Sequence, residues 1–219
     1  MRLCRQRRRV PSVSLRSRLF AATYDRMNAR AENAGLRELR AGLLAQAEGR
    51  VLEIGAGTGL NLSHYGGALD SLTLTEPERP MLNRLERRVR DGRAEALVLR
   101  APAEDLPFED ASFDTAVSTL VLCGVDDQPR ALRELRRVLR PAGRLLFLEH
   151  VRSDEPSLAR LQDRMNGFNR FVVGCDCNRS TLRTIEAAGF EVAEVEHREL
   201  PKAPKFVRPL IVGTATAPA

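Results

Sequence analysis

Residues 51–59 read Val-Leu-Glu-Ile-Gly-Ala-Gly-Thr-Gly, an apolar run that leads directly into three glycines at alternate positions. The apolar run predicts a buried strand, and the glycines predict a tight loop that lets the backbone come close to a ligand. In open α/β sheets such a loop binds the nucleoside part of a cofactor. A dinucleotide-binding loop would have a glycine at position 60, where this chain has Leu60, so the spacing disfavours nicotinamide and flavin cofactors.

The composition is that of one globular domain with a basic N-terminus. The chain has 219 residues, 43% of them hydrophobic and 29% charged, and a formal net charge of +6. Residues 1–18 hold seven arginines and no acid, which leaves 28 of the 35 basic residues against 29 acidic ones in the rest. We therefore expect no nucleic-acid partner, and we expect residues 1–18 to be a disordered basic tail that makes at most weak contact with an anionic surface.

The cysteines and the apolar runs indicate the cellular location of the protein and whether it spans a membrane or binds a metal. No stretch approaches the roughly 20 apolar residues of a membrane span, so none is expected. Cys4, Cys123, Cys175 and Cys177 form no disulfide framework, which favours a reducing, cytoplasmic location. No metal site is expected, because Cys175 and Cys177 supply only two thiolates and the three histidines are scattered.

Expected strands and helices alternate along the chain after residue 47. The expected strands cover 51–54, 72–75, 96–99, 113–119, 144–151, 190–197 and 207–215. The expected helices cover 19–47, a segment beginning at 61–65, 78–90, 129–140, 158–171 and 180–188. Helical crossovers between strands require a parallel sheet that is covered on both faces.

The last connection differs from the others. Residues 199–205 are too few for a crossover helix and include Pro201 and Pro204, so the final strand is expected to run antiparallel to its predecessor. The predicted fold is a single doubly wound α/β domain over residues 19–219. It has a Rossmann-like seven-stranded sheet, mostly parallel with an antiparallel C-terminal strand, and helices on both faces.

Six stretches in a fixed order carry a resemblance to a known family. They are VLEIGAGTGLNLSHY (51–65), AEDLPFEDASFDTAVST (103–119), LVLCGV (120–125), LRELRRVLRPAG (132–143), Glu149-His150, and the C-terminal pair CNR (177–179) and VRP (207–209). On these residues the chain resembles the class I S-adenosylmethionine-dependent methyltransferases of the ubiquinone-biosynthesis-like type. It is most similar to the group of methyltransferase-like thiol S-methyltransferases.

The resemblance implies an enzyme that uses S-adenosyl-L-methionine to methylate a small, partly apolar acceptor. A thiol is the first expectation, and a quinone, a phenol or a lipid headgroup are alternatives. A non-catalytic protein that binds the same nucleoside is the competing interpretation. Animal members begin with a membrane-anchoring helix, whereas this chain has its arginine-rich tail there, so membrane attachment does not carry over. The segment 19–47 would form a lid, in which Tyr24 and Asp25 either contact the site or pack in the core.

The resemblance also implies where the cofactor lies. The glycine loop would turn under its methionine and ribose, Glu53 would order the loop and meet the methionine ammonium, and Glu76 would accept hydrogen bonds from both ribose hydroxyls. The expected cofactor-binding residues are Glu53, Gly55, Ala56, Gly57, Gly59, Asn61, Glu76, Pro77, Ala103, Glu104, Thr119 and Leu120.

The adenine end and the acceptor side are less determined. Many relatives have an aspartate where this chain has Pro102, so Glu104 is the alternative partner for the adenine amino group, with a solvated side chain as the competing interpretation. Residues 118–121 read Ser-Thr-Leu-Val, an apolar floor unlike the motif of nucleic-acid amino methyltransferases. Cys123 is expected to pack rather than react. His150 is either a base for the acceptor or a structural histidine.

Overall fold

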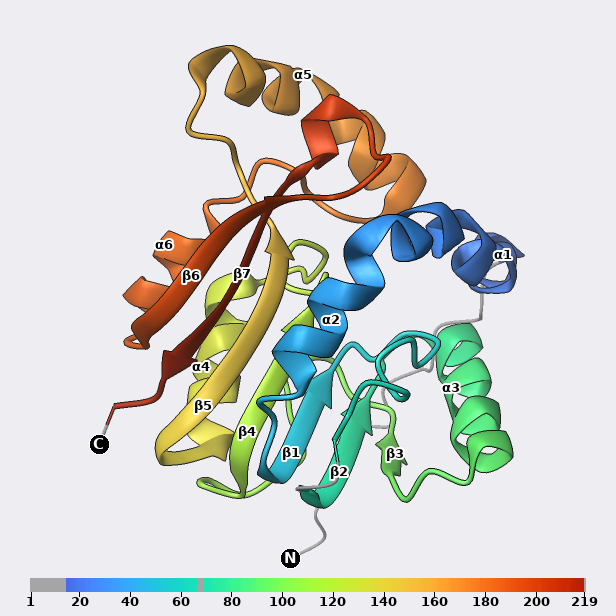
Figure 1. The fold of residues 1–219 in the computed structure, drawn as a ribbon, viewed down its shortest axis with the longest axis vertical. Helices are drawn as coiled ribbons and strands as arrows, with labels where there is room; N and C mark the ends of the chain where they lie inside the picture. The colour runs from blue at the N-terminus through green and yellow to red at the C-terminus, as the bar shows by residue number, and fades with distance from the viewer. Residues whose placement is uncertain (1–14, 67–68, 219) are drawn as a thin grey trace, which may run out of the picture.

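The computed structural model describes residues 15–66 and 69–218, and its sheet has seven strands in the order β3-β2-β1-β4-β5-β7-β6 (Figure 1). The order reverses between β1 and β4, which is the place where open α/β sheets form a ligand crevice. The strands are β1 (Gly49–Ile54), β2 (Leu69–Thr75), β3 (Leu97–Leu99), β4 (Phe113–Thr119), β5 (Leu139–His150), β6 (Glu191–Glu199) and β7 (Pro209–Thr216).

The predicted fold class is confirmed. β7 lies between β5 and β6 and pairs antiparallel with both, while the pairs among β1 to β5 are parallel. Gly213 is required there, because a Cβ at this position would lie 2.2 Å from the Glu194 carbonyl oxygen. The final strand is thus antiparallel, as the short connection predicts.

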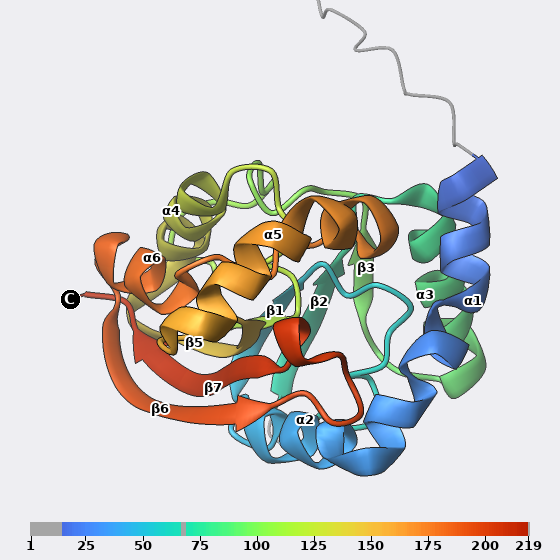
Figure 2. The same ribbon diagram turned by 90° about the horizontal axis from the view of Figure 1, so that it is seen from above.

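Helices cover both faces of the sheet and its carboxyl end (Figures 1 and 2). They are α1 (Leu15–Ala31), η1 (Glu32–Leu36), α2 (Arg37–Leu44), α3 (Arg79–Gly92), α4 (Gln128–Val138), α5 (Pro156–Val173), α6 (Thr181–Ala187) and the short η2 (Lys205–Val207). α2 and α3 pack against one face, and α4 and α6 pack against the other. β1 contributes to the hydrophobic core on each face of the sheet. Val51 belongs to the core beneath α2 and α3, and Leu52 and Ile54 belong to the core beneath α4 and α6.

Two expected helices differ from the structure. The helix expected to begin at residues 61–65 is wrong: the chain makes successive turns instead, including Leu62 N to Gly59 O at 3.3 Å and His64 N to Asn61 O at 2.9 Å. The Asn61 and Tyr65 side chains both bind one buried carboxylate, which holds this segment in turns. α4 ends at Val138, because Pro141 disfavours helical backbone at Arg140 and Leu139 already pairs with Phe113.

The N-terminal prediction is tested only in part. Residues 15–18 of the expected tail belong to α1, and residues 1–14 lie outside the described residues. Within the described part of the chain, every helix is too short or too polar to cross a membrane.

Candidate active site

The glycine loop after β1 follows a left-handed path at Gly55, Gly57 and Gly59, where φ is 55°, 59° and 84°. A Cβ at Gly55 would lie 2.6 Å from Val121 Cγ1, so this glycine lets the loop after β4 pack closely. A Cβ at Gly57 would meet only the Gly55 carbonyl oxygen, at 3.9 Å. Gly55 is therefore required by the protein itself, while Gly57 faces open space at the carboxyl edge of the sheet.

The carboxylate of Glu53 belongs to a buried hydrogen-bond network beneath this loop. Its carboxylate accepts from Asn61 Nδ2 at 2.9 Å and from the Tyr65 hydroxyl at 2.6 Å. Burial raises the pKa of Glu53, and these two hydrogen bonds oppose the rise. Burial and the Glu53 charge raise the pKa of Tyr65 well above its ordinary value, so the phenol stays protonated and donates. Glu53 thus orders the segment that follows the glycines.

Glu76, directly after β2, holds the loop from the other side. Its Oε2 accepts from the Gly57 amide at 2.9 Å and its Oε1 accepts from the Glu78 amide at 2.8 Å. Each oxygen keeps a lone pair for a further donor. Burial raises the pKa of Glu76 to about 7, against the two backbone hydrogen bonds. The neighbouring Ala56 amide donates to the Thr75 carbonyl at 2.9 Å, which fixes the loop to the end of β2.

Arg40 of α2, which the sequence patterns did not single out, joins these parts. Its Nε donates to Glu32 at 3.0 Å, and its Nη1 donates to Asn61 Oδ1 at 2.9 Å and to Thr119 Oγ1 at 3.0 Å. The Arg40 and Glu32 side chains are only 4% and 8% exposed. Among the described residues, Arg40 Nη2 takes no partner. The signal in the sequence was an arginine within the apolar pattern of a helix. It was not singled out, because α2 has the pattern of an ordinary amphipathic helix.

The N-terminal helix α1 closes over the same edge. Asp25 accepts from Thr58 Oγ1 and from Arg88 Nη2, both at 2.6 Å, so one carboxylate links α1 to the glycine loop and to α3. Burial raises the pKa of Tyr24 to about 12, with Arg40 opposing the rise, and its ring packs edge-on against Phe20. Both residues lie on α1, as expected; Asp25 contacts the glycine loop and Tyr24 packs against Phe20, and the lid role stays a prediction.

Comparison with known proteins identifies this arrangement. Residues 52–147 match the methyltransferase domain family. Human thiol S-methyltransferase TMT1B is 34% identical over 180 residues, which cover 78% of this chain and 73% of that protein. Human thiol S-methyltransferase TMT1A is 32% identical over 75% of this chain and 69% of its own length. The chain belongs to the class I S-adenosylmethionine-dependent methyltransferases.

The solved structures agree with this family. A methyltransferase from Thermotoga maritima, described as a possible histamine N-methyltransferase, superposes with a TM-score of 0.67 at 27% identity. The match covers 91% of this chain and 97% of that one. The protein is thus an S-adenosylmethionine-dependent enzyme, and the carboxyl edge between β1 and β4 is the methyltransferase's candidate active site.

The segment after β3 is where the sequence interpretation expects the adenine. Ala103 is buried and Pro102 is exposed. Glu104 Oε1 accepts from the backbone amides of Asp126 and Asp127, at 2.9 and 3.3 Å. Glu104 is thus neither free nor fully solvated, and its contact with adenine stays a prediction. Pro77 presents its carbonyl to Arg100 Nε at 2.9 Å.

The loop after β4 is shaped by Glu149, a second residue without an assigned role in the sequence interpretation. Its buried carboxylate accepts from Ser118 Oγ at 2.7 Å and from the amides of residues 121, 122 and 123 at 3.0, 3.1 and 3.3 Å. Leu120 adopts a φ of 60°, a strained value for a branched side chain. A hydrogen bond with the Cys175 thiol, together with burial, raises the pKa of Cys123 well above its ordinary value, which fits a packed thiol.

His150 lies at the end of β5 and is buried. Burial lowers its pKa to about 4, against smaller opposing contributions from the Pro209 and Val207 backbone. Its Nδ1 is buried without a hydrogen-bond partner among the described residues. So low a pKa makes His150 a weak proton acceptor near neutral pH, which argues against its use as the base for the acceptor.

Proposed function

We propose that this methyltransferase transfers the methyl group of S-adenosylmethionine to the sulfur of a small, partly apolar thiol. The observation that carries the proposal is the 32–34% identity with two human thiol S-methyltransferases across about three quarters of this chain. The matches cover 75–78% of this chain and so extend well beyond the cofactor loop.

The acid–base chemistry of the site supports a thiol. A thiol is a few per cent ionised near neutral pH and its thiolate is a strong nucleophile, so it reacts without a dedicated base. Phenols, alcohols and protonated amines gain more from a base. Two titratable groups near the site are poor bases: the pKa of His150 is lowered to about 4 and the pKa of Tyr24 is raised to about 12. Glu76, whose pKa is raised to about 7, is assigned to the ribose hydroxyls. Glu53 and Glu149 already accept several hydrogen bonds.

The residues at the carboxyl edge fit the cofactor. Gly57 leaves room for it, Glu76 offers a lone pair on each oxygen to the two ribose hydroxyls, and Glu53 supplies a carboxylate for the methionine ammonium. We add Arg40 to the expected set, because its Nη2 is available for the methionine carboxylate. The other residues proposed to bind the cofactor are those expected from the sequence, namely Gly55, Ala56, Gly59, Asn61, Pro77, Ala103, Glu104, Thr119 and Leu120.

When bound, the cofactor supplies a sulfonium whose methyl carbon is open to in-line displacement. The protein's part is to position the two reactants and to exclude water. The Glu53 and Glu76 contacts fix the glycine loop, and Glu149 fixes residues 120–123 in the loop after β4. The carbon–sulfur bond to the sulfonium breaks as the bond to the thiolate forms, giving a methyl thioether and S-adenosylhomocysteine. The thiol proton is lost to solvent before attack.

The setting of the reaction is part of the proposal. We place it in the cytoplasm, with a small molecule as acceptor and no nucleic acid, since the body of the chain carries 28 basic and 29 acidic residues. We also assign α1, η1 and α2 the role of a lid, because Asp25 ties α1 to the glycine loop and to α3.

A matched set of acceptors tests the proposal. The protein is incubated with S-adenosylmethionine and benzenethiol, phenol or aniline, which share one carbon skeleton and differ only in the acceptor atom. Mass spectrometry identifies the methylated product, and benzenethiol is expected to yield its methyl thioether fastest. Preferred methylation of phenol or aniline would overturn the thiol assignment. Cofactor binding with no transfer to any acceptor would instead support the non-catalytic interpretation.

A further inference from the structure

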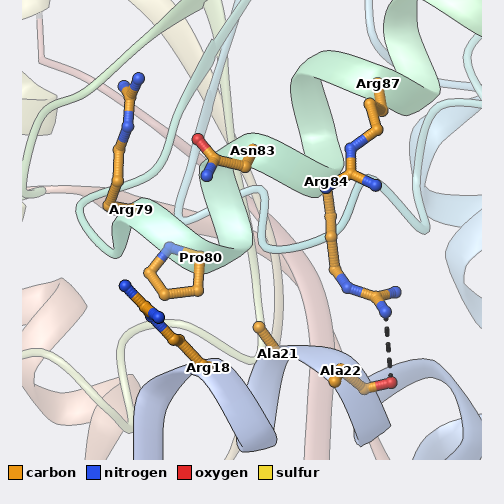
Figure 3. Close-up of a pocket in the computed structure, with 8 residues that line it drawn as sticks. All are labelled: Arg18, Ala21, Ala22, Arg79, Pro80, Asn83, Arg84 and Arg87. Carbon is orange, nitrogen blue, oxygen red and sulfur yellow. Dashed lines mark hydrogen bonds between the residues drawn. The ribbon is translucent and has the colours of Figure 1, made fainter. Parts of the chain in front are cut away.

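A hollow of about 470 Å³ lies between α1 and α3, and none of the expected cofactor-binding residues lines it (Figure 3). α1 contributes Arg18 and two alanines, and α3 contributes the remaining residues. The lining is Arg18, Ala21, Ala22, Arg79, Pro80, Asn83, Arg84 and Arg87. Four of these eight residues are arginines and none is acidic. We call this hollow the α1–α3 groove.

The arginines of the groove have no acidic partner among the described residues, and Arg18, Arg79 and Arg87 are exposed. Arg18, Arg79 and Arg87 form no ion pair or hydrogen bond among the described residues. Arg84 donates only to the Ala22 carbonyl, at 3.3 Å, as the dashed line in Figure 3 shows. By contrast Arg88, on the same helix, pairs with Asp25 at 2.6 Å. The groove therefore concentrates positive charge that the protein does not neutralise.

The start of α3 adds to this potential. Helix N-termini carry partial positive charge and favour acidic residues in the first turn. α3 instead begins with Arg79 and Pro80 and has no acid in its first turn, while Glu78 before it makes no capping hydrogen bond and does not line the groove. Arg79 lies in this first turn, and Arg84 and Arg87 follow along the same helix, so an anion held between the arginines would relieve the repulsion among their charges.

We infer that the α1–α3 groove binds a small phosphate-bearing anion. Guanidinium groups match phosphate oxygens with paired hydrogen bonds, and arginines rather than lysines supply all the charge here. The volume is in the range of small-ligand sites, large enough for a diphosphate or a small organic phosphate. A second hollow of about 380 Å³ continues past Arg84 and Arg87 but includes Asp91, so the anion belongs in the first.

An anion in this groove would bridge α1 and α3. It would contact Arg18 on α1 and the three lining arginines of α3, beside the existing Asp25–Arg88 pair. Because α1 also contacts the glycine loop through Asp25 and Thr58, bridging should hold α1 against the loop and tighten cofactor binding. This coupling rests on the proposed function of the lid, whereas anion binding itself does not.

Calorimetric titration of the full chain with inorganic pyrophosphate tests the site. The test variant is Arg18→Gln/Arg79→Gln/Arg87→Gln, which changes exposed side chains that hold no protein partner. The control is Arg133→Gln/Arg160→Gln/Arg183→Gln, which removes the same charge from exposed positions on α4, α5 and α6. We expect one saturable site, weakened at least about tenfold in the test variant and retained in the control. Inorganic phosphate should bind the same site more weakly.

The outcomes separate the alternatives. No saturable binding, or an equal loss in both variants, would overturn the site in favour of general attraction to a basic surface. Binding only to phosphatidylserine vesicles or to an oligonucleotide, with none to pyrophosphate, would also overturn it. S-adenosylmethionine titrations with and without pyrophosphate test the coupling: unchanged affinity would remove it. A chain that binds pyrophosphate but no S-adenosylmethionine would refute the proposed cofactor site and leave the anion site standing.

Discussion

Arg40 Nη1 lies 2.9 Å from Asn61 Oδ1, and this hydrogen bond joins the helix before β1 to the turns after it. Asn61 Nδ2 in turn donates to the Glu53 carboxylate at 2.9 Å and to Thr119 Oγ1 at 2.8 Å. The ends of β1 and β4 and the helix α2 therefore share one buried polar network. Such a network fixes geometry only while every member keeps its partners.

Replacing Arg40 with methionine should destabilise the fold strongly. The change leaves the Glu32 carboxylate buried without its cation, which costs about 3–5 kcal/mol when one partner of a buried ion pair is removed. Urea unfolding measures the loss. The double change Glu32→Leu/Arg40→Met should recover part of it, because the Glu32 carboxylate is no longer left buried without its cation. Equal stability of the single and double variants would contradict a buried pair.

Gly57→Ala should separate folding from cofactor binding. The new Cβ meets no atom closer than 3.9 Å, so the cost to the fold is the left-handed backbone, about 1–2 kcal/mol. The methyl group enters the space assigned to S-adenosylmethionine, so affinity should fall more than stability. Gly55→Ala is the matched contrast, since its Cβ would lie 2.6 Å from Val121 and should disrupt the folded loop. Unchanged cofactor affinity in Gly57→Ala would place the cofactor elsewhere.

Asp25→Asn should loosen α1 without unfolding the domain. It weakens the pair with Arg88 and the hydrogen bond from Thr58, at a partly exposed carboxylate. Stopped-flow measurement should show faster release of S-adenosylmethionine, with a small change in the unfolding midpoint. Asp91→Asn, at an exposed position on α3, is the control and should release the cofactor at the wild-type rate. Identical release from all three proteins would remove the lid role.

The affinity for S-adenosylmethionine should depend on pH through Glu76. Burial raises the pKa of this carboxyl to about 7, and ribose hydroxyls donate to its ionised form. Affinity should therefore be full above pH 7 and fall as the pH drops below it, by at most about tenfold per pH unit. Titrations from pH 6 to 8 measure this, and Glu76→Gln should flatten the profile. A wild-type profile that is flat, or that rises toward low pH, would contradict the assignment.

The sheet was predictable because its signals are local. Apolar runs with intervening amphipathic helices require parallel strands, and the short connection with Pro201 and Pro204 requires the antiparallel β7. The turns at residues 61–65 were not predictable in this way. They depend on Asn61 and Tyr65 reaching Glu53, and a sequence window does not show which side chains share a buried carboxylate.

The candidate site shows the same division. Glu53, Glu76 and the glycines follow strand ends, so their place at one edge follows from the topology. Arg40 and Glu149 were missed, because each acts through contacts across the fold: Arg40 with Asn61 and Thr119, and Glu149 with the loop after β4.

Calorimetric titration with S-adenosylmethionine at pH 8 tests the central claim most directly. The account predicts one site of micromolar affinity in the wild type, weakened at least about tenfold by Glu76→Ala, because the ribose loses its acceptor and the Gly57 amide loses its partner. Circular dichroism verifies that the variant is folded. No binding by the wild type, or equal affinity in the folded variant, would contradict the account.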